Sequence, residues 1–433
     1  MRTLRRTFAL LTAPLCAACL CSVAPAPAAL ATAKAPPEPI GGAQLGATGV
    51  VVDRSAGLAP PKLAASSYVI ADGDTGEVLA AKDPHGHFLP ASTMKTLTAI
   101  SLIPKLDRAA MVRPTRRTCD VEGTKVGMTP KLKYRVEDLF KAAIMVSGND
   151  AAVALTQAHG GYQRTLNTMN AEARRLQAND TLAGSPNGLD VDLGLNIKTQ
   201  HTSAYDLALI MRQGLRLPDF REYVGTVNAH WPALPTKKQR KKGKKTGGYP
   251  IYSHDRLLPG EPHAYRGMIG GKNGYTNAAQ QTFVGAARRG GHTIIIALMH
   301  SPQLWTYATQ LLNWGFQARG KVKPVGTLVD PVDTQKKKEP ASKGVGKVLG
   351  PLAPTADGSG RSWSRPIAGA AVLIVVGTGL VLWVRRRRRW TDEAGEAGGR
   401  PAADEAGNVK LVEPTDPDRA SDAADHPDQG VRD

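Results

Sequence analysis

The chain has 433 residues, 42% of them hydrophobic, and a net charge of +19 from 56 Lys and Arg against 37 Asp and Glu. This hydrophobic content is enough for a packed core and excludes a fully disordered chain. Most of the excess positive charge lies in three short runs, near the N-terminus, at residues 237–245 and at residues 385–389. Because the rest of the chain is nearly balanced, we exclude the broad basic face of a nucleic-acid-binding fold.

The N-terminal segment has the order of a secretory signal peptide. Three arginines lie within the first six residues, and an apolar run at 8–23 is followed by Ala-x-Ala sites. This order predicts a signal peptide over residues 1–33, with the general secretory and twin-arginine routes both open. The alternative is an uncleaved anchor, for which the apolar run is short. Removal of the segment would leave Cys119 as the one cysteine, which excludes an intramolecular disulfide.

The body of the chain reads as one mixed domain behind a linker. Residues 34–64 are rich in Pro, Ala and Gly, and we expect them to form that linker. Two alternating runs, 67–71 and 77–81, flank a Gly-Asp-Thr-Gly turn and predict a hairpin. Apolar periodicity predicts helices at 93–103, 136–146, 150–158, 162–176, 203–213 and 304–317, and strands at 282–288 and 293–300. Strands at both ends of a region with helices between them indicate an α+β domain over residues 65–320.

The C-terminal part carries the signals of a membrane anchor. Residues 321–365 are rich in Pro, Gly, Lys and Ser, which predicts a spacer. Residues 366–384 carry no charge and are about long enough to cross a bilayer as a helix. The arginines at 385–389 indicate a cytoplasmic side, so we expect the bulk of the chain to be extracellular. The rest of segment 385–433 is acidic and is predicted to be a disordered cytoplasmic tail. The alternative for 366–384 is a buried helix of a soluble domain.

Ser92 and Lys95 form the first candidate catalytic pair. They are the ends of the chain's single Ser-x-x-Lys, at the start of a predicted helix. Side chains three residues apart share one face of a helix, so the lysine can reach the serine. A desolvated lysine can serve as the base that a serine nucleophile needs. The alternative is a capping serine with a surface lysine.

Ser147 and Asn149 form the second candidate pair. Ser147-Gly148-Asn149 follows an apolar stretch, where a short turn can present a hydroxyl and an amide together. The hydroxyl can relay a proton, and the amide can orient a substrate. The alternative is a turn in which both residues cap helices. A second Ser-x-Asn, Ser185 to Asn187, ranks lower because Asn187-Gly188 is an ordinary turn signal.

The third candidate element has two versions. Lys245-Thr246-Gly247 is a literal Lys-Thr-Gly, but it ends the polybasic run, where we expect no strand. Lys272-Asn273-Gly274 stands just ahead of the two strong strands, and small residues beside a strand lysine allow close approach of a substrate backbone. We therefore choose Lys272, and interpret Lys245 as a solvated loop charge.

Together these elements resemble the serine-type D-alanyl-D-alanine carboxypeptidases among the low-molecular-weight penicillin-binding proteins. The resemblance covers roughly residues 65–320. It extends beyond the triplets to Leu89-Pro90-Ala91 before the nucleophile, to the residues that follow Asn149, and to the residues around Lys272. Three further segments also resemble the family, namely Gly188-Leu189-Asp190, His201-Thr202-Ser203-Ala204-Tyr205-Asp206-Leu207-Ala208 and Arg256-Leu257-Leu258. The resemblance implies the penicillin-binding or β-lactamase fold, with an antiparallel sheet flanked by helices plus a helical lobe.

The resemblance also implies a role for each catalytic residue. Ser92 would attack the carbonyl of the penultimate D-Ala in a peptidoglycan stem peptide, and Lys95 would remove its proton. Ser147 would relay a proton to the leaving D-Ala, and Asn149 would orient the substrate amide. Water would then hydrolyse the acyl-enzyme. Penicillins would acylate Ser92 in the same way.

The substrate-binding residues implied by the resemblance lie in one segment. Lys272 would supply positive potential and, with Asn273, hold the terminal carboxylate. Gly274 would let the substrate lie close, and the backbone N–H groups of Ser92 and Tyr275 would form the oxyanion hole. The family usually has Thr or Ser where this chain has Asn273, so activity could be reduced or re-tuned. It often has His where this chain has Asn187, which we regard as a minor difference.

Two rival functions and several partners complete the predictions. A β-lactamase would need an asparagine four residues after a glutamate, but Glu172 is followed at that spacing by Leu176. A catalytically weak wall-binding protein is the other rival, motivated by Asn273. We expect no cofactor and no metal site, and interpret His201 as a structural histidine beside a helix start. The basic segment from Lys237 to Lys245 could bind anionic wall polymer, the alternative being a solvated loop.

Overall fold

The computed structural model describes residues 38–245 and 247–335. The predicted signal peptide and transmembrane helix lie outside these residues, as does most of the predicted spacer. Within the described residues, no helix combines the length and the apolar character that crossing a bilayer requires.

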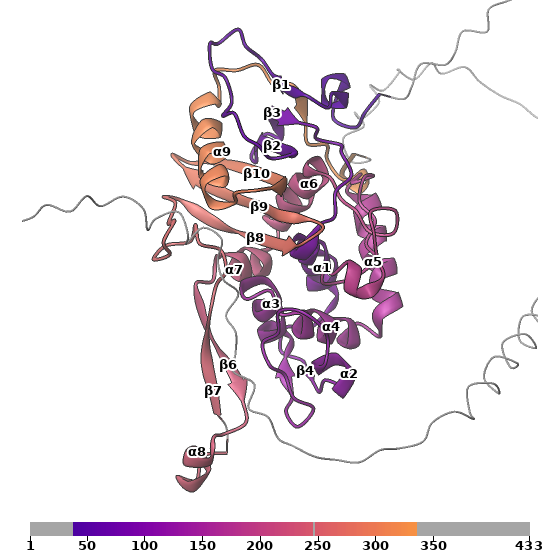
Figure 1. Ribbon diagram of the computed structural model, residues 1–433, viewed down its shortest axis with the longest axis vertical. Helices are drawn as coiled ribbons and strands as arrows, with labels where there is room; N and C mark the ends of the chain where they lie inside the picture. Colours follow the sequence, from indigo (N-terminus) through magenta and orange to yellow (C-terminus); the bar gives the residue numbers. More distant parts are fainter. Residues whose placement is uncertain (1–37, 246, 336–433) are drawn as a thin grey trace, which may run out of the picture. The chain divides into compact units, whose positions relative to one another are not determined.

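A seven-stranded antiparallel sheet forms the centre of the described region (Figure 1). Its order is β1-β3-β2-β10-β9-β8, with the short β11 also paired to β3. Its strands are β1 (Val50–Val52), β2 (Ser67–Asp72), β3 (Glu77–Lys82), β8 (Met268–Thr276), β9 (Gln280–Arg289), β10 (His292–Ser301) and β11 (Gly326–Thr327). The predicted hairpin and the two predicted C-terminal strands are therefore confirmed, and β8 is an edge strand.

Helices cover both faces of the sheet and build a lobe beside it. α9 packs against β2 and β10 on one face, and α6 packs against them on the other. The helices are α1 (Met94–Leu102), α2 (Arg116–Cys119), α3 (Val136–Met145), α4 (Asn149–Ala158), α5 (Tyr162–Arg175), α6 (Ala204–Gly214), α7 (Pro218–Gly225), α8 (Lys237–Lys241), α9 (Trp305–Ala318) and α10 (Val332–Gln335). Short 3₁₀ helices are η1 (Ala43–Gly46), η2 (Ala91–Thr93), η3 (Ile103–Lys105) and η4 (Val191–Leu193). The six predicted helices are confirmed, and the α+β class with them.

Two smaller ribbons lie outside the main sheet. One pairs β4 (Met111–Val112) with β5 (Tyr134–Arg135). The other pairs β6 (Asn228–Ala233) with β7 (Gly247–Tyr252) and reaches away from the sheet, with α8 at its tip (Figure 1). The expectation that no strand follows the polybasic run is thus wrong, because β7 begins at Gly247.

The packed region is wider than the 65–320 expected from composition. On the N-terminal side, Leu45 is fully buried and β1 pairs with β3. On the C-terminal side, β11 pairs with β3, and Leu328 is buried. The residues before Ala65 therefore complete the sheet in part, although their Pro and Gly content is typical of a linker.

Candidate active site

Ser92 lies in the turn that leads into α1. The turn η2 is held from two sides, since Thr93 Oγ1 donates to Pro90 O at 2.5 Å and Thr282 Oγ1 on β9 donates to the same oxygen at 3.0 Å. Ala91 has a positive φ of 46°, which is uncommon for a residue with a side chain. This strained and anchored turn leaves Ser92 only half-buried, whereas its neighbours in the chain are buried.

Lys95 lies one helical turn after Ser92, at the centre of a buried polar cluster. Its side chain is among the most buried in the described residues, with 1% exposure. Its Nζ contacts four oxygens: Ser92 Oγ at 2.8 Å, Asn149 Oδ1 at 2.8 Å, the carbonyl oxygen of Asn187 at 2.8 Å and Ser147 Oγ at 3.4 Å. The structure thus brings the first two candidate pairs together around one amine.

The surroundings of Lys95 favour its neutral form. Burial lowers the pKa of this amine well below its usual value, and the nearby charge of Lys272 lowers it further, while Asp150 opposes the shift. An amine with a lowered pKa is a free base over more of the neutral pH range. Lys95 is therefore placed, and its protonation is shifted, so that it can accept a proton from Ser92.

Ser147 and Asn149 lie at the junction of α3 and α4. Ser147 is buried and has a positive φ of 62°, and the turn is closed by Gly148 N, which donates to Ala142 O at 3.0 Å. Asn149 begins α4, and its side-chain Nδ2 donates to Glu122 O at 2.8 Å. The amide of Asn149 is therefore fixed from one side by a loop and from the other by Lys95.

Asp150 holds the loop that fixes Asn149. This fully buried carboxylate accepts hydrogen bonds from the backbone N–H groups of Val126 at 3.1 Å, Gly127 at 3.0 Å and Met128 at 3.1 Å. These three bonds tie the loop of Val126 to the start of α4. The residue after the Ser-x-Asn turn thus anchors the wall of the site, which sequence reasoning did not predict.

The strand β8 brings Lys272 and Gly274 to the same site. Lys272 is 1% exposed, and its Nζ donates to Asn273 O at 2.6 Å. A Cβ at Gly274 would lie 2.6 Å from Ser92 N, so only glycine lets the strand approach the nucleophile turn this closely. Asn273 is half-buried, and Tyr275 is 55% exposed. Strand β8 therefore forms one wall beside Ser92.

Burial also changes the proton affinity of Lys272. It lowers the pKa of the amine to about 7, an effect that the Asp255 charge opposes. Asp255 is buried too, and burial raises the pKa of its carboxyl group. A lysine in this state can carry a charge in the site and lose it near neutral pH.

The rival residues lie elsewhere. Lys245 is exposed between α8 and β7. Ser185 turns its Oγ to Gln200 Oε1, at 2.7 Å, although the carbonyl of Asn187 reaches Lys95. The ring of His201 stacks on the ring of His87, with the two centroids 4.3 Å apart.

Glu172 does not reach the cluster either. Both its carboxylate oxygens contact Arg175 on α5, at 2.7 and 2.8 Å. Within the described part of the chain, no group of three or more His, Cys, Asp or Glu side chains could hold a metal ion.

Sequence reasoning missed three supports of the site. Gly188 passes so close to η2 that an added Cβ would lie 1.7 Å from Ala91 O. Thr276 at the end of β8 donates to Asp190 Oδ2 at 2.6 Å. Thr282 bridges β9 and the nucleophile turn, as described above. The glycine and Asp190 belong to the Gly-Leu-Asp stretch already noted in the sequence, and Thr276 ends the stretch around Lys272, but the role of each was not predicted and nothing in the sequence alone marks Thr282.

Comparisons with known proteins point to one family of enzymes. A family profile described as D-alanyl-D-alanine carboxypeptidase matches residues 54–303. The D-alanyl-D-alanine carboxypeptidase DacB2 of Mycobacterium tuberculosis is 36% identical over 280 residues, which are 63% of this chain and 89% of that protein. A crystal structure of a D-alanyl-D-alanine carboxypeptidase from the same organism is 35% identical, with a TM-score of 0.57 over 64% of this chain and 99% of that one.

A more distant structure shares the fold. The Streptomyces K15 DD-transpeptidase is 24% identical, with a TM-score of 0.54, and is covered over its whole length by 60% of this chain. The fold expected from the sequence, the penicillin-binding type, is therefore confirmed. By the family match and by this fold, the chain belongs to the D-alanyl-D-alanine carboxypeptidase family.

Proposed function

We propose that Ser92 is the nucleophile of a serine D,D-carboxypeptidase that removes the terminal D-Ala from peptidoglycan stem peptides. The observation that carries this assignment is the 2.8 Å contact between Ser92 Oγ and the buried Nζ of Lys95. A serine hydroxyl is a weak nucleophile until a base takes its proton, and a desolvated amine is such a base. Neutral Lys95 accepts the proton while Ser92 Oγ attacks the carbonyl carbon of the penultimate D-Ala.

The departure of D-Ala needs a proton on its nitrogen. Ser147 Oγ lies 3.4 Å from Lys95 Nζ and within the same cluster, so it can pass a proton from the lysine to the leaving amine. Asn149, held by Glu122 O and Lys95, orients the substrate amide. The close approach of Gly274 to Ser92 N supports an oxyanion hole made by the N–H groups of Ser92 and Tyr275.

The terminal carboxylate of the substrate is the partner of Lys272 and Asn273. A charged lysine and an amide that donates hydrogen bonds are both suited to a carboxylate. The amide of Asn273 replaces the hydroxyl usual in the family, from a longer side chain. Water then hydrolyses the Ser92 ester. Its hydroxyl group bonds to the acyl carbon, the bond from that carbon to Ser92 Oγ breaks, and the remaining proton of the water passes to Ser92 Oγ. A β-lactam acylates Ser92 by the same first step.

A second function, wall binding with weak catalysis, has one specific observation in its favour. Lys272 Nζ contacts both the carbonyl and, at 3.3 Å, the side-chain Oδ1 of Asn273. In this rotamer the side-chain oxygen of Asn273 accepts a hydrogen bond from Lys272. The substrate carboxylate would have to break this contact, which would weaken turnover.

The cellular setting of the proposal rests on the sequence. Enzymes of this family act on the cell wall, and residues 1–33 have the pattern of an export signal. We place the catalytic domain outside the cell, with residues 366–384 as the membrane anchor and residues 385–433 in the cytoplasm. An anionic wall polymer is the proposed partner of the basic segment 237–245, whose α8 is exposed at the tip of the β6–β7 ribbon.

Labelling with a fluorescent penicillin tests the nucleophile. Ser92→Ala should abolish covalent labelling and the release of D-Ala from a stem pentapeptide, while the thermal unfolding midpoint stays near that of the wild type. Ser147→Ala should label slowly, and Ser101→Ala, on α1 but outside the cluster, should label normally. Persistent labelling of Ser92→Ala would show that another residue is the nucleophile. Labelling without any D-Ala release by the wild type would favour the weak wall-binding function.

A further inference from the structure

A cavity of about 500 Å³ lies between α6, α7 and the sheet, away from the Ser92 cluster. Four of its lining residues are arginines, namely Arg212, Arg216, Arg221 and Arg288, and one is a carboxylate, Asp74. None of the residues of the catalytic cluster lines it. The cavity is therefore separate from the catalytic site, and its positive charge suits an anionic ligand.

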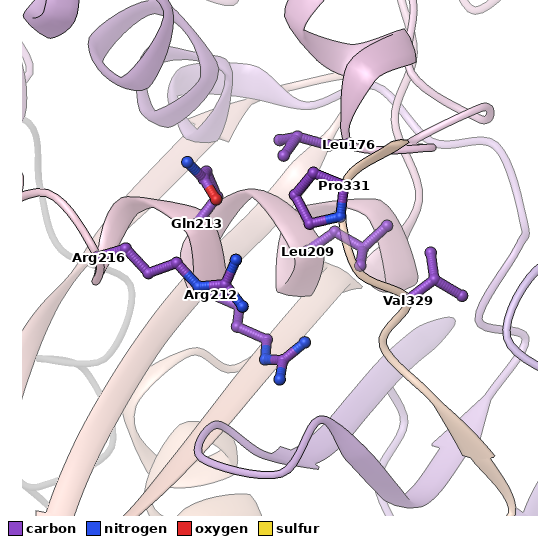
Figure 2. A pocket seen from close by; sticks show the side chains of 7 residues that line it. All are labelled: Leu176, Leu209, Arg212, Gln213, Arg216, Val329 and Pro331. Carbon is purple, nitrogen blue, oxygen red and sulfur yellow. The ribbon is translucent and has the colours of Figure 1, made fainter. Parts of the chain in front are cut away.

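The arginines come from two helices, the turn between them and one strand of the sheet. Arg212 is on α6, Arg216 is in the turn that follows it, Arg221 is on α7 and Arg288 is on β9. Arg212 and Arg216 also line a second pocket, which Figure 2 shows. Both guanidinium groups lie 3.4 Å from the same carboxylate oxygen of Asp330, so these two charges stand close together. Burial and the charge of Arg216 both lower the pKa of Arg212. The fold thus gathers like charges that repel one another.

Two carboxylates face these four guanidinium groups. Asp330 Oδ1 lies 3.4 Å from a nitrogen of Arg212 and 3.4 Å from a nitrogen of Arg216, so one carboxylate is shared by two arginines. Asp74 lies 3.7 Å from Arg288, and His292 comes within 3.9 Å of the same carboxylate. Among the described lining residues and their ion-pair partners, two positive charges remain in excess.

Many guanidinium donors of the cavity are not bonded to other described residues. Arg212 donates to Gly73 O at 3.2 Å and to Leu328 O at 3.1 Å, which ties it into the fold. Arg221 donates to the backbone of Leu215, and Arg288 to Thr293 Oγ1 at 3.1 Å. Each guanidinium has five N–H donors. Within the described residues Arg212 uses three of them, and Arg216 and Arg221 use one each.

We propose that this cavity is a binding site for a phosphate group. The planar forks of arginine match the oxygens of phosphate in pairs, and an excess of two positive charges matches a dianion. A carboxylate ligand would leave one charge unmatched. The cavity is far larger than a water molecule, which occupies about 30 Å³, so it leaves room for a substituent on the phosphate. Free phosphates and phosphomonoester headgroups, such as that of phosphatidic acid, share this chemistry.

Calorimetric titration of the full-length chain in neutral detergent tests the site. Two probes are compared at constant ionic strength: inorganic pyrophosphate, and dihexanoyl phosphatidic acid below its micelle concentration. The test variant is Arg216→Ala with Arg221→Ala, since both side chains are exposed. Arg212 is left in place because of its bonds to Gly73 and Leu328. The control is Arg116→Ala with Arg117→Ala, which removes the same charge and the same residue type from exposed positions on α2.

The arginine variant should bind at least about tenfold more weakly than the wild type, because charge-assisted hydrogen bonds are lost. The control should bind as the wild type does, and D-Ala release should be unchanged in both variants. Tighter binding of the lipid would identify a headgroup as the source, and tighter binding of pyrophosphate a free phosphate. Binding of neither probe would overturn the proposal, and so would an equal loss in both variants.

Discussion

Two regions of the molecule hold similar Lys-x-Gly triplets in different surroundings. One is the edge strand β8, with Lys272, and the other is the tip of the β6–β7 ribbon, with Lys245. Lys272 is 1% exposed on β8, beside a glycine that touches the Ser92 turn. Lys245 is exposed, in a segment that follows the short basic helix α8. Burial lowers the pKa of Lys272 to about 7. The charge of Lys272 in turn lowers the pKa of Lys95. The packing of a strand, more than the letters of a triplet, gives a lysine its chemistry.

The largest effect that separates the two regions is expected at Lys95. Lys95→Met keeps a long apolar side chain but removes the base, and we expect the acylation rate with penicillin to fall about 10²- to 10⁴-fold. Lys242→Met, near the ribbon tip, should leave the rate unchanged. Stopped-flow labelling measures both. A Lys95→Met enzyme that acylates at the wild-type rate would remove the lysine from the mechanism.

The pH dependence of the acylation rate should have a rising limb set by Lys95 and a falling limb set by Lys272. With the pKa of Lys95 well below its usual value, the rate at low substrate should rise with pH as Lys95 loses its proton. It should fall above about pH 7, because Lys272 then loses the charge that holds the carboxylate. Each limb should approach about tenfold per pH unit.

Lys272→Arg isolates the falling limb. A guanidinium stays charged at every pH of the assay, so the fall near neutral pH should move to higher pH in this variant. Lys245→Arg is the matched control and should change neither limb. A falling limb that stays in place in Lys272→Arg would assign it to another group.

A smaller effect is expected when the wall of the site is loosened. Asp150 accepts from Val126 N through Oδ1 and from Gly127 N and Met128 N through Oδ2. Asp150→Asn replaces one of these oxygens with an amide nitrogen, so at least one N–H group loses its acceptor. We expect a loss of about 1–3 kcal/mol in the free energy of unfolding, measured in urea. The acylation rate should fall by about tenfold because Asn149 is less well held. Asp138→Asn, half-buried on α3, is the comparison. An acylation rate that falls equally in both variants would show that Asp150 is not specifically needed to position Asn149.

The smallest effect is expected at Asn273. Asn273→Thr restores the hydroxyl usual in the family, and carboxypeptidase turnover should be preserved or rise. The rise should be a few-fold, since one hydrogen bond to a charged group is exchanged for another. Release of D-Ala from a stem pentapeptide measures it. A large loss of turnover would show that the longer amide is needed for the carboxylate of the substrate.

The sequence predicted the parts of the site that depend on local spacing. Ser92 and Lys95 share a helix face because they are three residues apart, and Ser147 and Asn149 share one turn. The strong periodicity of the predicted helices and of β2, β3, β9 and β10 reflects buried faces, so these elements were predicted to within a few residues. Lys272 was chosen over Lys245 from its neighbours in the chain.

What could not be predicted depends on contacts between distant residues or on atypical strands. The ribbon strands β6 and β7 each contain a proline, Pro232 and Pro250, which argues against a strand in a sequence. The carbonyl of Asn187 contacts Lys95 through its backbone, which no side-chain pattern can signal. The carboxylate of Asp150 meets a loop more than twenty residues away. Such contacts are set by tertiary packing.

The most direct test of this account compares Lys272→Ala with Lys245→Ala. The second-order rate of acylation by a fluorescent penicillin is measured for both variants and the wild type, at one pH and ionic strength. Lys272→Ala should acylate about a hundredfold or more slowly, because a charge-assisted contact in a buried site is lost. Lys245→Ala should acylate at the wild-type rate. If Lys245→Ala abolishes acylation and Lys272→Ala does not, β8 is not the edge of the active site.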